Sequence, residues 1–350
     1  MSQSPLQIVA LGLTERMEPL LEAVWQHPAY AIKAVADNDP EVAEAFARRY
    51  ECEAFDDFRQ LIIQTKADIL AVGMPVHLSA EYIKLAIEKE YHILKAPPAG
   101  LNFEQAAEWI QQAFKLGRRF TLVQDGRFHP LLDRLRFMID GADANFWHLI
   151  SAVCHVPMPP LEPQNRWLYD PSMAGGGVLL QNTYGLIDEL VLCFGLPQLV
   201  YGQMMNQAPD RQQRMSLTED TAIVTMRFTD TLMAQVIASR TLGPARQHLR
   251  IHGKDRFLTL MPEELLACDH DGGVLERHEF KAEKPVWAQR LLDNFVDSLN
   301  KPNEVALFPP QENDLLTMAV LEAAYLSTRT GMPEEPEKIF RLAGSTTPLI

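Results

Sequence analysis

Short apolar runs alternate with longer amphipathic segments over residues 6–124. Each run is four to eight residues long and bounded by polar positions, which predicts buried strands at 6–12, 30–37, 67–73, 91–94 and 119–124. The intervening segments carry apolar residues at helical spacing, and in one of them Asp39 is suited to cap a helix that begins at Pro40. Strands alternating with helices of this length form a parallel sheet that is covered on both faces. Ligands of such sheets bind beyond the carboxyl ends of the strands.

The pattern changes after residue 124. Strand-like segments predominate, and an Asp-Gly turn within 268–276 is suited to a hairpin, so we expect a large, mostly antiparallel sheet. Amphipathic helices are predicted at 286–300 and 311–331. The chain is therefore predicted to hold an α/β Rossmann domain at 1–124 and an α+β domain at 125–350. The final helices of the second domain are free to pack back on the first.

The charge of the chain argues against several classes of partner. With 46 acidic and 32 basic residues the net charge is −14, so we expect neither nucleic acid nor membrane as a partner. No apolar run approaches the roughly 18 residues of a membrane span, and no basic segment followed by an apolar one opens the chain, so a cytoplasmic protein is expected. The His and Cys residues form no metal-ligating spacing, so no metal is expected. The four cysteines are expected to be reduced: Cys52, Cys154, Cys193 and Cys268.

The order of these elements, together with several strings, resembles the Gfo/Idh/MocA family of NAD(P)-dependent oxidoreductases. The strings that carry the resemblance are "ADNDPEVAEAFARRY", "PVHLSAEYIKLAIEKEYHIL", "GRFHPLLDRLRFMI", "NRWLYDPSMAGGGVLL", "LTEDTAIVTMRF" and "AVLEAAYLSTRTG". The resemblance extends over nearly the whole chain. It implies a two-domain fold, a bound NAD(H) or NADP(H), and a ligand of the sugar or polyol class.

The family has a glycine-rich turn after its first strand, where backbone N–H groups approach the pyrophosphate. Gly12 keeps the first glycine, but Thr14 and Met17 stand at the second and third positions. Thr14 narrows the approach, although its hydroxyl is able to bond a phosphate oxygen. Asp37 follows the second strand, where it either binds the adenine ribose and favours NAD over NADP or serves only as a turn residue before a helix. The resemblance also places Met74, Pro75 and Pro98 at the cofactor, whose binding we expect to be weak or lost.

The family's catalytic groups have no counterparts in this sequence. Its Glu-Lys-Pro motif falls on residues 96–98, which puts Pro97 where the lysine belongs, and proline has no proton to give. Lys95 is nearby, as a solvated lysine at the end of a strand or as a candidate proton donor. The family's helical Asp and His positions fall on Gln181 and Gly185. Tyr184 is expected to be a packed aromatic residue, with proton donation as the alternative. No residue is assigned as catalytic, and Lys95 and Tyr184 are the candidates.

Three functions remain open. The first is a divergent oxidoreductase with impaired or non-standard hydride transfer on a sugar- or polyol-like ligand, and the second is a non-catalytic regulatory, ligand-sensing or protein-binding member. The third is a structural subunit that partners an active homologue. Apolar residues on both faces of 221–228 and 232–239 predict a homo-oligomer formed through the second sheet. The candidate ligand-binding residues are Arg127, Arg166, Trp167, Tyr169, Gln181 and Asn182.

Overall fold

The computed structural model describes residues 4–143, 145–157, 162–208, 211–241, 243–281, 286–310 and 312–342. The chain divides into two compact units. The first comprises residues 1–100, 104–128 and 283–314, and the second comprises 101–103, 129–282 and 315–350. Among the described helices, none is long and apolar enough to cross a membrane.

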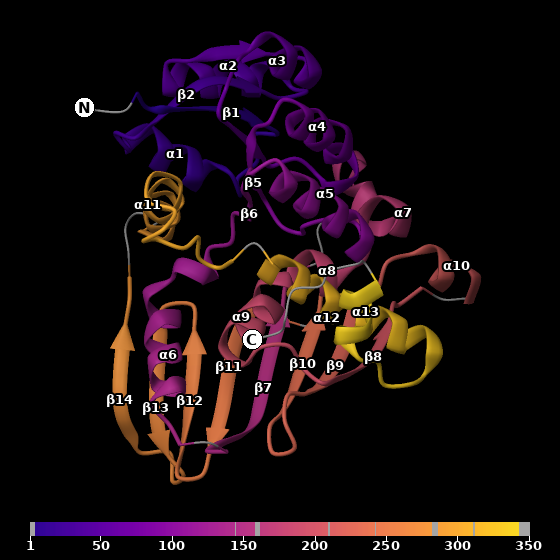
Figure 1. Cartoon of the computed structure of the whole chain (residues 1–350). Helices are drawn as coiled ribbons and strands as arrows, with labels where there is room; N and C mark the ends of the chain where they lie inside the picture. Colours follow the sequence, from indigo (N-terminus) through magenta and orange to yellow (C-terminus); the bar gives the residue numbers. More distant parts are fainter. Residues whose placement is uncertain are drawn as a thin grey trace. The chain divides into compact units, whose positions relative to one another are not determined.

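The first unit is built on a six-stranded parallel sheet in the order β3-β2-β1-β4-β5-β6, as expected of a Rossmann fold (Figure 1). Its strands are β1 (Leu6–Leu11), β2 (Tyr30–Ala36), β3 (Glu53–Phe55), β4 (Ile69–Val72), β5 (His92–Lys95) and β6 (Phe120–Leu122). Its helical segments are α1 (Glu18–Gln26), α2 (Pro40–Tyr50), α3 (Phe58–Gln64), α4 (Val76–Glu88), α5 (Phe103–Lys115), η1 (Gly126–Phe128) and α11 (Val286–Asn300). Asp39 caps α2 as predicted, since its side chain accepts from the Glu41 N–H at 3.0 Å.

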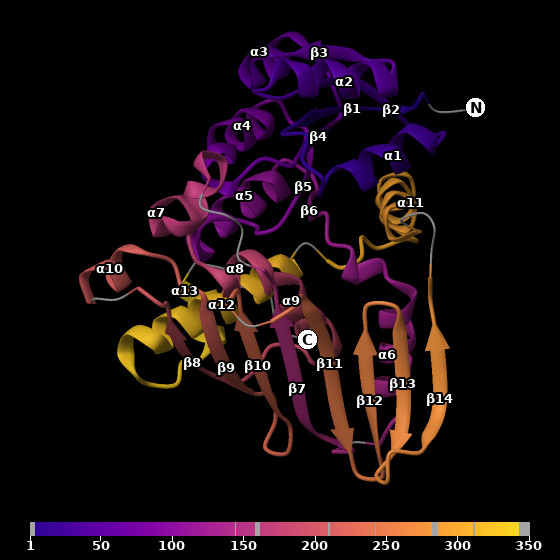
Figure 2. The ribbon, with the colours of Figure 1, turned by 180° about the vertical axis from the view of Figure 1, so that it is seen from behind.

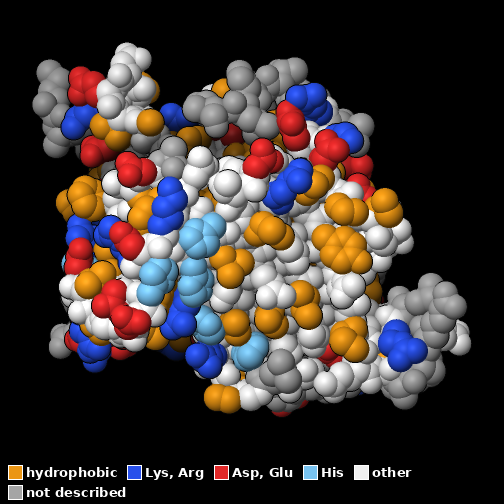
Figure 3. All heavy atoms as spheres, turned by 90° about the horizontal axis from the view of Figure 1, so that it is seen from below, with side chains coloured by type: hydrophobic (Ala, Val, Ile, Leu, Met, Phe, Trp, Pro, Cys, Tyr) orange, Lys and Arg blue, Asp and Glu red, His pale blue; other side chains and the backbone are white. Residues whose placement is uncertain are grey.

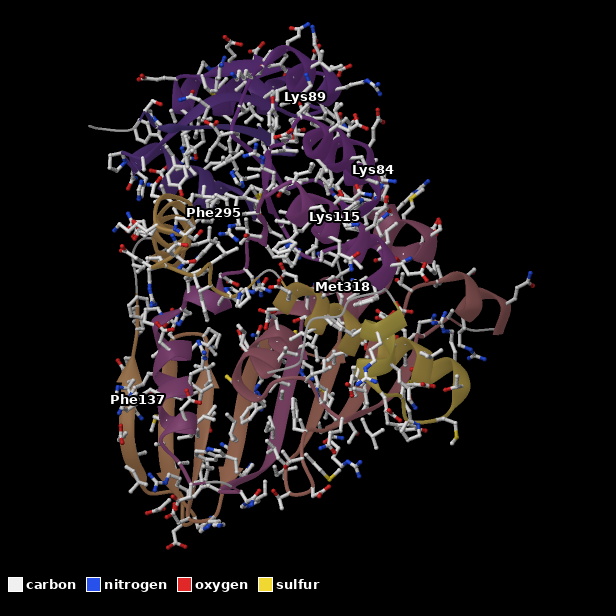
Figure 4. The ribbon with its side chains drawn as sticks, in the orientation of Figure 1. Lys84, Lys89, Lys115, Phe137, Phe295 and Met318 are labelled. Carbon is white, nitrogen blue, oxygen red and sulfur yellow. The ribbon has the colours of Figure 1, made fainter. Side chains whose placement is uncertain are left out.

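Helix α11 belongs to this unit although it lies far along the chain from the sheet that it covers. It packs against α1, and the Tyr30 hydroxyl of β2 donates to the carbonyl of Leu292 at 2.7 Å. Phe295, labelled in Figure 4, meets the ring of His92 edge to face at 5.8 Å. The sequence pattern located α11 but could not assign it to a sheet, because amphipathicity shows that a face is buried and not what buries it.

The second unit contains a mixed, mostly antiparallel sheet of eight strands in the order β14-β13-β12-β11-β7-β10-β9-β8, which confirms the predicted class. Among the described strands of this second sheet, only β10 and β7 pair in parallel. The strands are β7 (Trp147–His155), β8 (Leu199–Met205), β9 (Thr221–Arg227), β10 (Met233–Ser239), β11 (Arg246–Gly253), β12 (Arg256–Met261), β13 (Glu264–Asp269) and β14 (Val274–Glu279).

Helices cover one face of this sheet. Figure 1 shows α6, α9 and α12 in front of the strands, and Figure 2 shows the opposite face with no described helix over it. Helix α12 begins in the first unit and continues in the second. The helical segments of this unit are α6 (Pro130–Asp140), η2 (Pro163–Tyr169), α7 (Pro171–Ala174), α8 (Val178–Asn182), α9 (Tyr184–Phe194), α10 (Arg211–Ser216), α12 (Glu312–Thr330) and α13 (Pro336–Leu342).

Several short elements were not expected from the sequence, namely β3, α3, β8 and β12. Strand β8 contains Gly202, and glycine weakens the strand pattern. The structure explains this glycine, because a Cβ there would lie 2.4 Å from the carbonyl oxygen of Ala324 on α12. Gly202 therefore allows a helix to approach the sheet closely, and its N–H donates to the Ser327 hydroxyl at 3.1 Å.

Candidate functional site

The carboxyl ends of β1, β2, β4 and β5 lie at one edge of the parallel sheet, which is where ligands of such sheets bind. The segments that follow these strands carry the predicted cofactor-binding residues. Gly12 follows β1, Asp37 follows β2, Met74 and Pro75 follow β4, and Pro98 follows β5. The structure thus brings the six predicted positions, Thr14 included, to one edge of the first unit.

The turn after β1 is tightly packed against the segment after β4. Gly12 has a φ of +72°, and a Cβ there would lie 2.5 Å from the Met74 nitrogen, so this position requires glycine. The Thr14 hydroxyl donates to the carbonyl of Gly73 at 3.3 Å. Met17 is buried, and a Cβ at Gly73 would lie 2.1 Å from its Cγ. Thr14 and Met17 therefore fill space at this turn, and the threonine hydroxyl already has an acceptor.

The Asp37 carboxylate connects two backbone turns. One oxygen accepts from the Leu13 N–H at 2.8 Å, and the other accepts from the Asp39 N–H at 3.1 Å. The turn-forming role of Asp37 is therefore present in the structure. A carboxylate oxygen has more than one acceptor direction, so ribose binding by Asp37 stays a prediction.

Lys95 is not a solvated lysine at a strand end, and that interpretation was wrong. The side chain is 1% exposed, and its Nζ donates to the carbonyls of Ala96 at 2.9 Å and of Pro98. Burial and, to a smaller extent, the positive charge of Arg16 lower the pKa of Lys95 to about 7, while Asp314 opposes the shift. A strand-end position predicts solvent exposure only when no later segment covers it, and here the loop that follows β5 folds over the amine.

Arg127, predicted to bind ligand, lies in η1 and forms an ion pair with Asp314, the third residue of α12. Both side chains are 1% exposed. Sequence reasoning missed Asp314, because an acidic residue in the first turn of a helix is ordinarily explained by the helix dipole. The pair joins two segments of the first unit that are 187 residues apart in the chain.

In the second unit, the glycine cluster that precedes α8 packs against neighbouring elements. A Cβ at Gly175 would lie 2.2 Å from the carbonyl oxygen of Leu101, and one at Gly177 would lie 1.9 Å from that of Glu219. The Glu219 carboxylate accepts from the N–H groups of Gly177 at 2.7 Å and Leu179 at 3.0 Å, and from the Tyr325 hydroxyl at 2.8 Å. Burial raises the pKa of Glu219. Glu219 and Tyr325 are thus the residues that hold this loop, and the only sequence signal for Glu219 was its place in "LTEDTAIVTMRF".

Gln181 and Gly185, which the sequence resemblance predicts to stand at the family's Asp and His positions, lie in α8 and α9. Gln181 is buried, and its Nε2 donates to the carbonyl of Ala174 at 2.6 Å. Gly185 lies in the first turn of α9, beside Tyr184, which is 2% exposed as expected of a packed aromatic residue. Asp188 on the same helix accepts from the Thr317 hydroxyl at 2.9 Å. Neither the Gln181 amide nor the glycine at position 185 offers a group that gives up or takes a proton near neutral pH.

Arg240 lies close to two of the predicted ligand-binding residues, Asn182 and Tyr169. It is 4% exposed, and its Nε donates to Asn182 Oδ1 at 2.9 Å. Burial lowers the pKa of Arg240, and the nearby Glu219 and Tyr169 oppose this shift. The η2 segment, which holds Arg166, Trp167 and Tyr169, is attached nearby through Thr218, whose hydroxyl donates to the Leu168 carbonyl at 2.7 Å and whose N–H donates to the Tyr169 carbonyl at 3.1 Å. The structure therefore brings Tyr169 and Asn182 to one buried polar cluster, whose central residue was not predicted.

Comparison with known proteins agrees with this architecture. A Rossmann unit with a glycine turn after β1, followed by an α+β unit on an eight-stranded sheet, is the fold of two-domain NAD(P)-dependent oxidoreductases. The profile described as "Oxidoreductase family, NAD-binding Rossmann fold" matches residues 6–124, and the profile "GFO/IDH/MocA C-terminal domain" matches residues 138–259. The chain belongs to the Gfo/Idh/MocA family of oxidoreductases.

Individual relatives are distant. A dTDP-3,4-didehydro-2,6-dideoxy-alpha-D-glucose 3-reductase of Saccharopolyspora spinosa is 27% identical over 182 residues, which cover 51% of this chain and 53% of the reductase. A D-glucoside 3-dehydrogenase of Escherichia coli K12 is 23% identical over 205 residues, 56% of each chain. The match thus spans little more than half the length of these curated relatives.

Solved structures extend the likeness to the whole fold. A levoglucosan dehydrogenase in complex with NADH and levoglucosan superimposes with a TM-score of 0.82 at 17% identity, covering 95% of this chain and 99% of that one. An oxidoreductase from Agrobacterium radiobacter in complex with NAD+ gives a TM-score of 0.78 at 13% identity, with the same coverage. At this level of identity the agreement concerns the fold.

Proposed function

We propose that this chain is a Gfo/Idh/MocA protein that takes a sugar- or polyol-like ligand and transfers hydride to or from it slowly or by a non-standard route. The proposal rests on the sequence resemblance, which puts Pro97, Gln181 and Gly185 at the positions where the family carries its Lys, Asp and His. General acid–base assistance contributes roughly 10²- to 10⁴-fold in rate, so alcohol oxidation without it is severely slowed.

Neither Gln181 nor the neighbouring Lys95 supplies the acid–base groups of the family. The Gln181 amide is bonded to the Ala174 carbonyl, and an amide neither gives nor takes a proton near neutral pH. Lys95 has a suitable pKa of about 7, but its amine is enclosed and bonded to two backbone carbonyls. We propose that Lys95 holds the loop at residues 96–98 in place. Proton transfer by Lys95 is the alternative role.

A dinucleotide would be held by the edge of the parallel sheet, with Gly12 and Thr14 at the pyrophosphate, Asp37 at the ribose, and Met74, Pro75 and Pro98 along the nicotinamide side. The dinucleotide would supply the hydride acceptor or donor. Gly12 keeps the left-handed turn that such binding requires, whereas Thr14 and Met17 fill space that glycines leave open. We therefore propose weak binding, with NAD preferred to NADP because a 2′-phosphate would meet the charge of Asp37.

We propose the class of ligand from the relatives, whose names describe enzymes that act on sugars. Tyr169, Asn182, Arg166 and Trp167 provide hydroxyl, amide, guanidinium and indole groups, which suit a molecule rich in hydroxyls. The second candidate function is that of a ligand-sensing family member without catalysis. It is favoured because the side chains of Gln181 and Lys95 are already hydrogen-bonded to backbone carbonyls.

Turnover and binding measured on the same purified protein separate these candidates. The panel pairs NAD+ and NADP+ with glycosides, free sugars and polyols, and each ligand is also titrated by calorimetry. Slow turnover supports the oxidoreductase, and saturable sugar binding with no turnover supports the sensor. Turnover of a simple sugar above roughly 1 s⁻¹, an ordinary enzymatic rate, contradicts both.

A further inference from the structure

Arg240 is a buried cation that has no carboxylate in direct contact. It is 4% exposed, and an arginine stays protonated near neutral pH. In the part of the chain that the structure describes, its guanidinium makes one hydrogen bond, from Nε to Asn182 Oδ1 at 2.9 Å, and no ion pair. The N–H groups on Nη1 and Nη2 therefore have no acceptor among the described residues. A buried charge in this state is costly unless an acceptor is supplied.

Asn182 places a second donor group beside the guanidinium. A guanidinium has only donors, so the amide atom that faces Arg240 is the oxygen, and the NH2 group of Asn182 points away from it. This NH2 group also lacks an acceptor among the described residues. Asn182 is only partly buried, so a ligand is able to reach it from solvent. The two side chains thus offer hydrogen-bond donors, and the amide oxygen between them is already engaged.

Two neighbouring strands hold these side chains together. Arg240 directly follows β10, and the backbone carbonyl of Asn182 accepts from Cys154 Sγ on β7 at 3.7 Å. Strands β10 and β7 pair in parallel, with Ala238 opposite Cys154, so their carboxyl ends lie at the same edge of the sheet. The donors of Arg240 and Asn182 therefore lie side by side at the carboxyl end of this strand pair, and the bond from Nε to Oδ1 fixes their spacing.

The carboxylates near Arg240 are bonded to other groups. Glu219 accepts from two backbone N–H groups and a hydroxyl, as described above, and Asp220 accepts from the Gln207 N–H at 2.8 Å and the Thr221 hydroxyl at 2.9 Å. Both charges favour the protonated guanidinium, but neither carboxylate lies at ion-pair distance from it. Coulombic energy falls with distance, so an anion in contact with Arg240 gains more than it loses to Glu219.

Arg240 lies on the face of the second sheet that the helices cover. It continues the alternation of Ala234, Val236 and Ala238, which are buried on that face. The open face is a different surface. Figure 3 shows hydrophobic side chains beside His, Lys and Arg side chains there, and a second copy of the chain is expected to cover it. Binding at Arg240 therefore does not compete with the expected oligomer.

We propose that Arg240 and Asn182 bind the carboxylate of an acidic sugar, such as a uronic or aldonic acid. This inference rests on the proposed function, whose sugar- or polyol-like ligand it narrows to one class. A sugar carboxylate is ionised at neutral pH, and its two oxygens accept hydrogen bonds without donating one. It therefore matches the N–H groups of a planar guanidinium and an adjacent amide. A hydroxyl in the same place makes only uncharged and weaker contacts.

Calorimetric titration of the full chain with D-glucuronate, D-glucose and D-glucuronamide tests the proposal. These sugars differ only at C6, which carries a carboxylate, a hydroxymethyl group or a carboxamide. The wild type should bind glucuronate about tenfold or more tightly than the two neutral sugars, because hydrogen bonds between charged groups are the stronger ones. D-gluconate against sorbitol repeats the comparison for open-chain ligands. Arg240→Gln should reduce the preference for the acid to less than about twofold.

Asn182→Asp is the second variant. Its carboxylate keeps an acceptor for the Arg240 Nε, but it removes the NH2 donor and repels an anion, so it should also abolish the preference. Where Arg240→Gln fails to fold, Asn182→Asp carries the test. Arg227→Gln is the matched control: Arg227 is exposed on β9, opposite Met233 at the start of β10 and roughly 20 Å along the strand from Arg240. It removes the same charge and should change the preference less than about twofold.

Several results would overturn the proposal. One is equal binding of the acidic and neutral members of both ligand pairs by the wild type, and another is a preference that survives Arg240→Gln. Equal loss of the preference in Arg240→Gln and Arg227→Gln means general attraction of anions, and no saturable binding of either acid up to about 20 mM means that the site is absent. Failure of the proposed function gives a different result. Hydride transfer with NAD+ or NADP+ is then missing for every sugar, while the preference for the acids in binding persists.

Discussion

The replacement Lys95→Met provides a quantitative test of the buried amine. In the folded protein the pKa of Lys95 is lowered from 10.5 to about 7, whereas unfolding returns the amine to water. Unfolding therefore takes up a proton between these two values, and the contribution of Lys95 to stability improves as the pH rises from 7 to 10.5. The full change corresponds to about 5 kcal/mol, since one pKa unit is worth about 1.4 kcal/mol. Below pH 7 the contribution is constant.

The methionine variant removes this titration and also two hydrogen bonds. The carbonyls of Ala96 and Pro98 lose their donor, which costs about 1–3 kcal/mol each. At pH 7 this loss is largely offset, because the variant no longer carries a buried cation, so its free energy of unfolding should be close to that of the wild type. Toward pH 10 the neutral amine of the wild type still donates both hydrogen bonds at no charging cost, and the variant should be less stable by several kcal/mol.

Urea unfolding followed by tryptophan fluorescence at pH 7, 8, 9 and 10 measures the difference between the two proteins. Lys89→Met is the control, since Lys89 is exposed at the end of α4 (Figure 4) and its loss should leave the pH dependence unchanged. Parallel stability curves for the wild type and Lys95→Met over this range would refute the reasoning. In that case the amine is not desolvated, and its position in the loop has to be reconsidered.

Three further outcomes are expected. Calorimetry should find weak or no binding of NADH, tightened by Thr14→Gly, while Asp37→Ala should weaken NAD more than NADP; a sub-micromolar dissociation constant for the wild type contradicts this. Light scattering should give a mass above the 39.6 kDa of one chain, because the open sheet carries apolar side chains, and a monomer at working concentrations contradicts the oligomer. No single restoration among Pro97→Lys, Gln181→Asp and Gly185→His should yield sugar oxidation, since such groups act together; the triple variant is expected to show at most a trace, and a single variant with ordinary turnover contradicts that view.

The sequence by itself determined the two fold classes and the order of most elements. Periodicity is a local property: alternation marks a half-buried strand, and apolar spacing of three and four marks a helix, so β1, α2 and the β11 strand are visible without a structure. The same local reading located the turn at Gly12 and placed Pro97, Gln181 and Gly185 in their loops and helices. It missed β3, whose three residues are too few to show a period.

Only the tertiary structure decided what these residues touch. Arg127 meets Asp314 across 187 residues of chain, and Glu219 joins Gly177 and Tyr325 across 42 and 106 residues. Lys95 is enclosed by a loop that begins with the next residue, which no strand pattern foretells. The physical reason is common to these cases: burial and pKa depend on the groups that surround a side chain in space, and a pattern along the chain reports only the direction in which that side chain points.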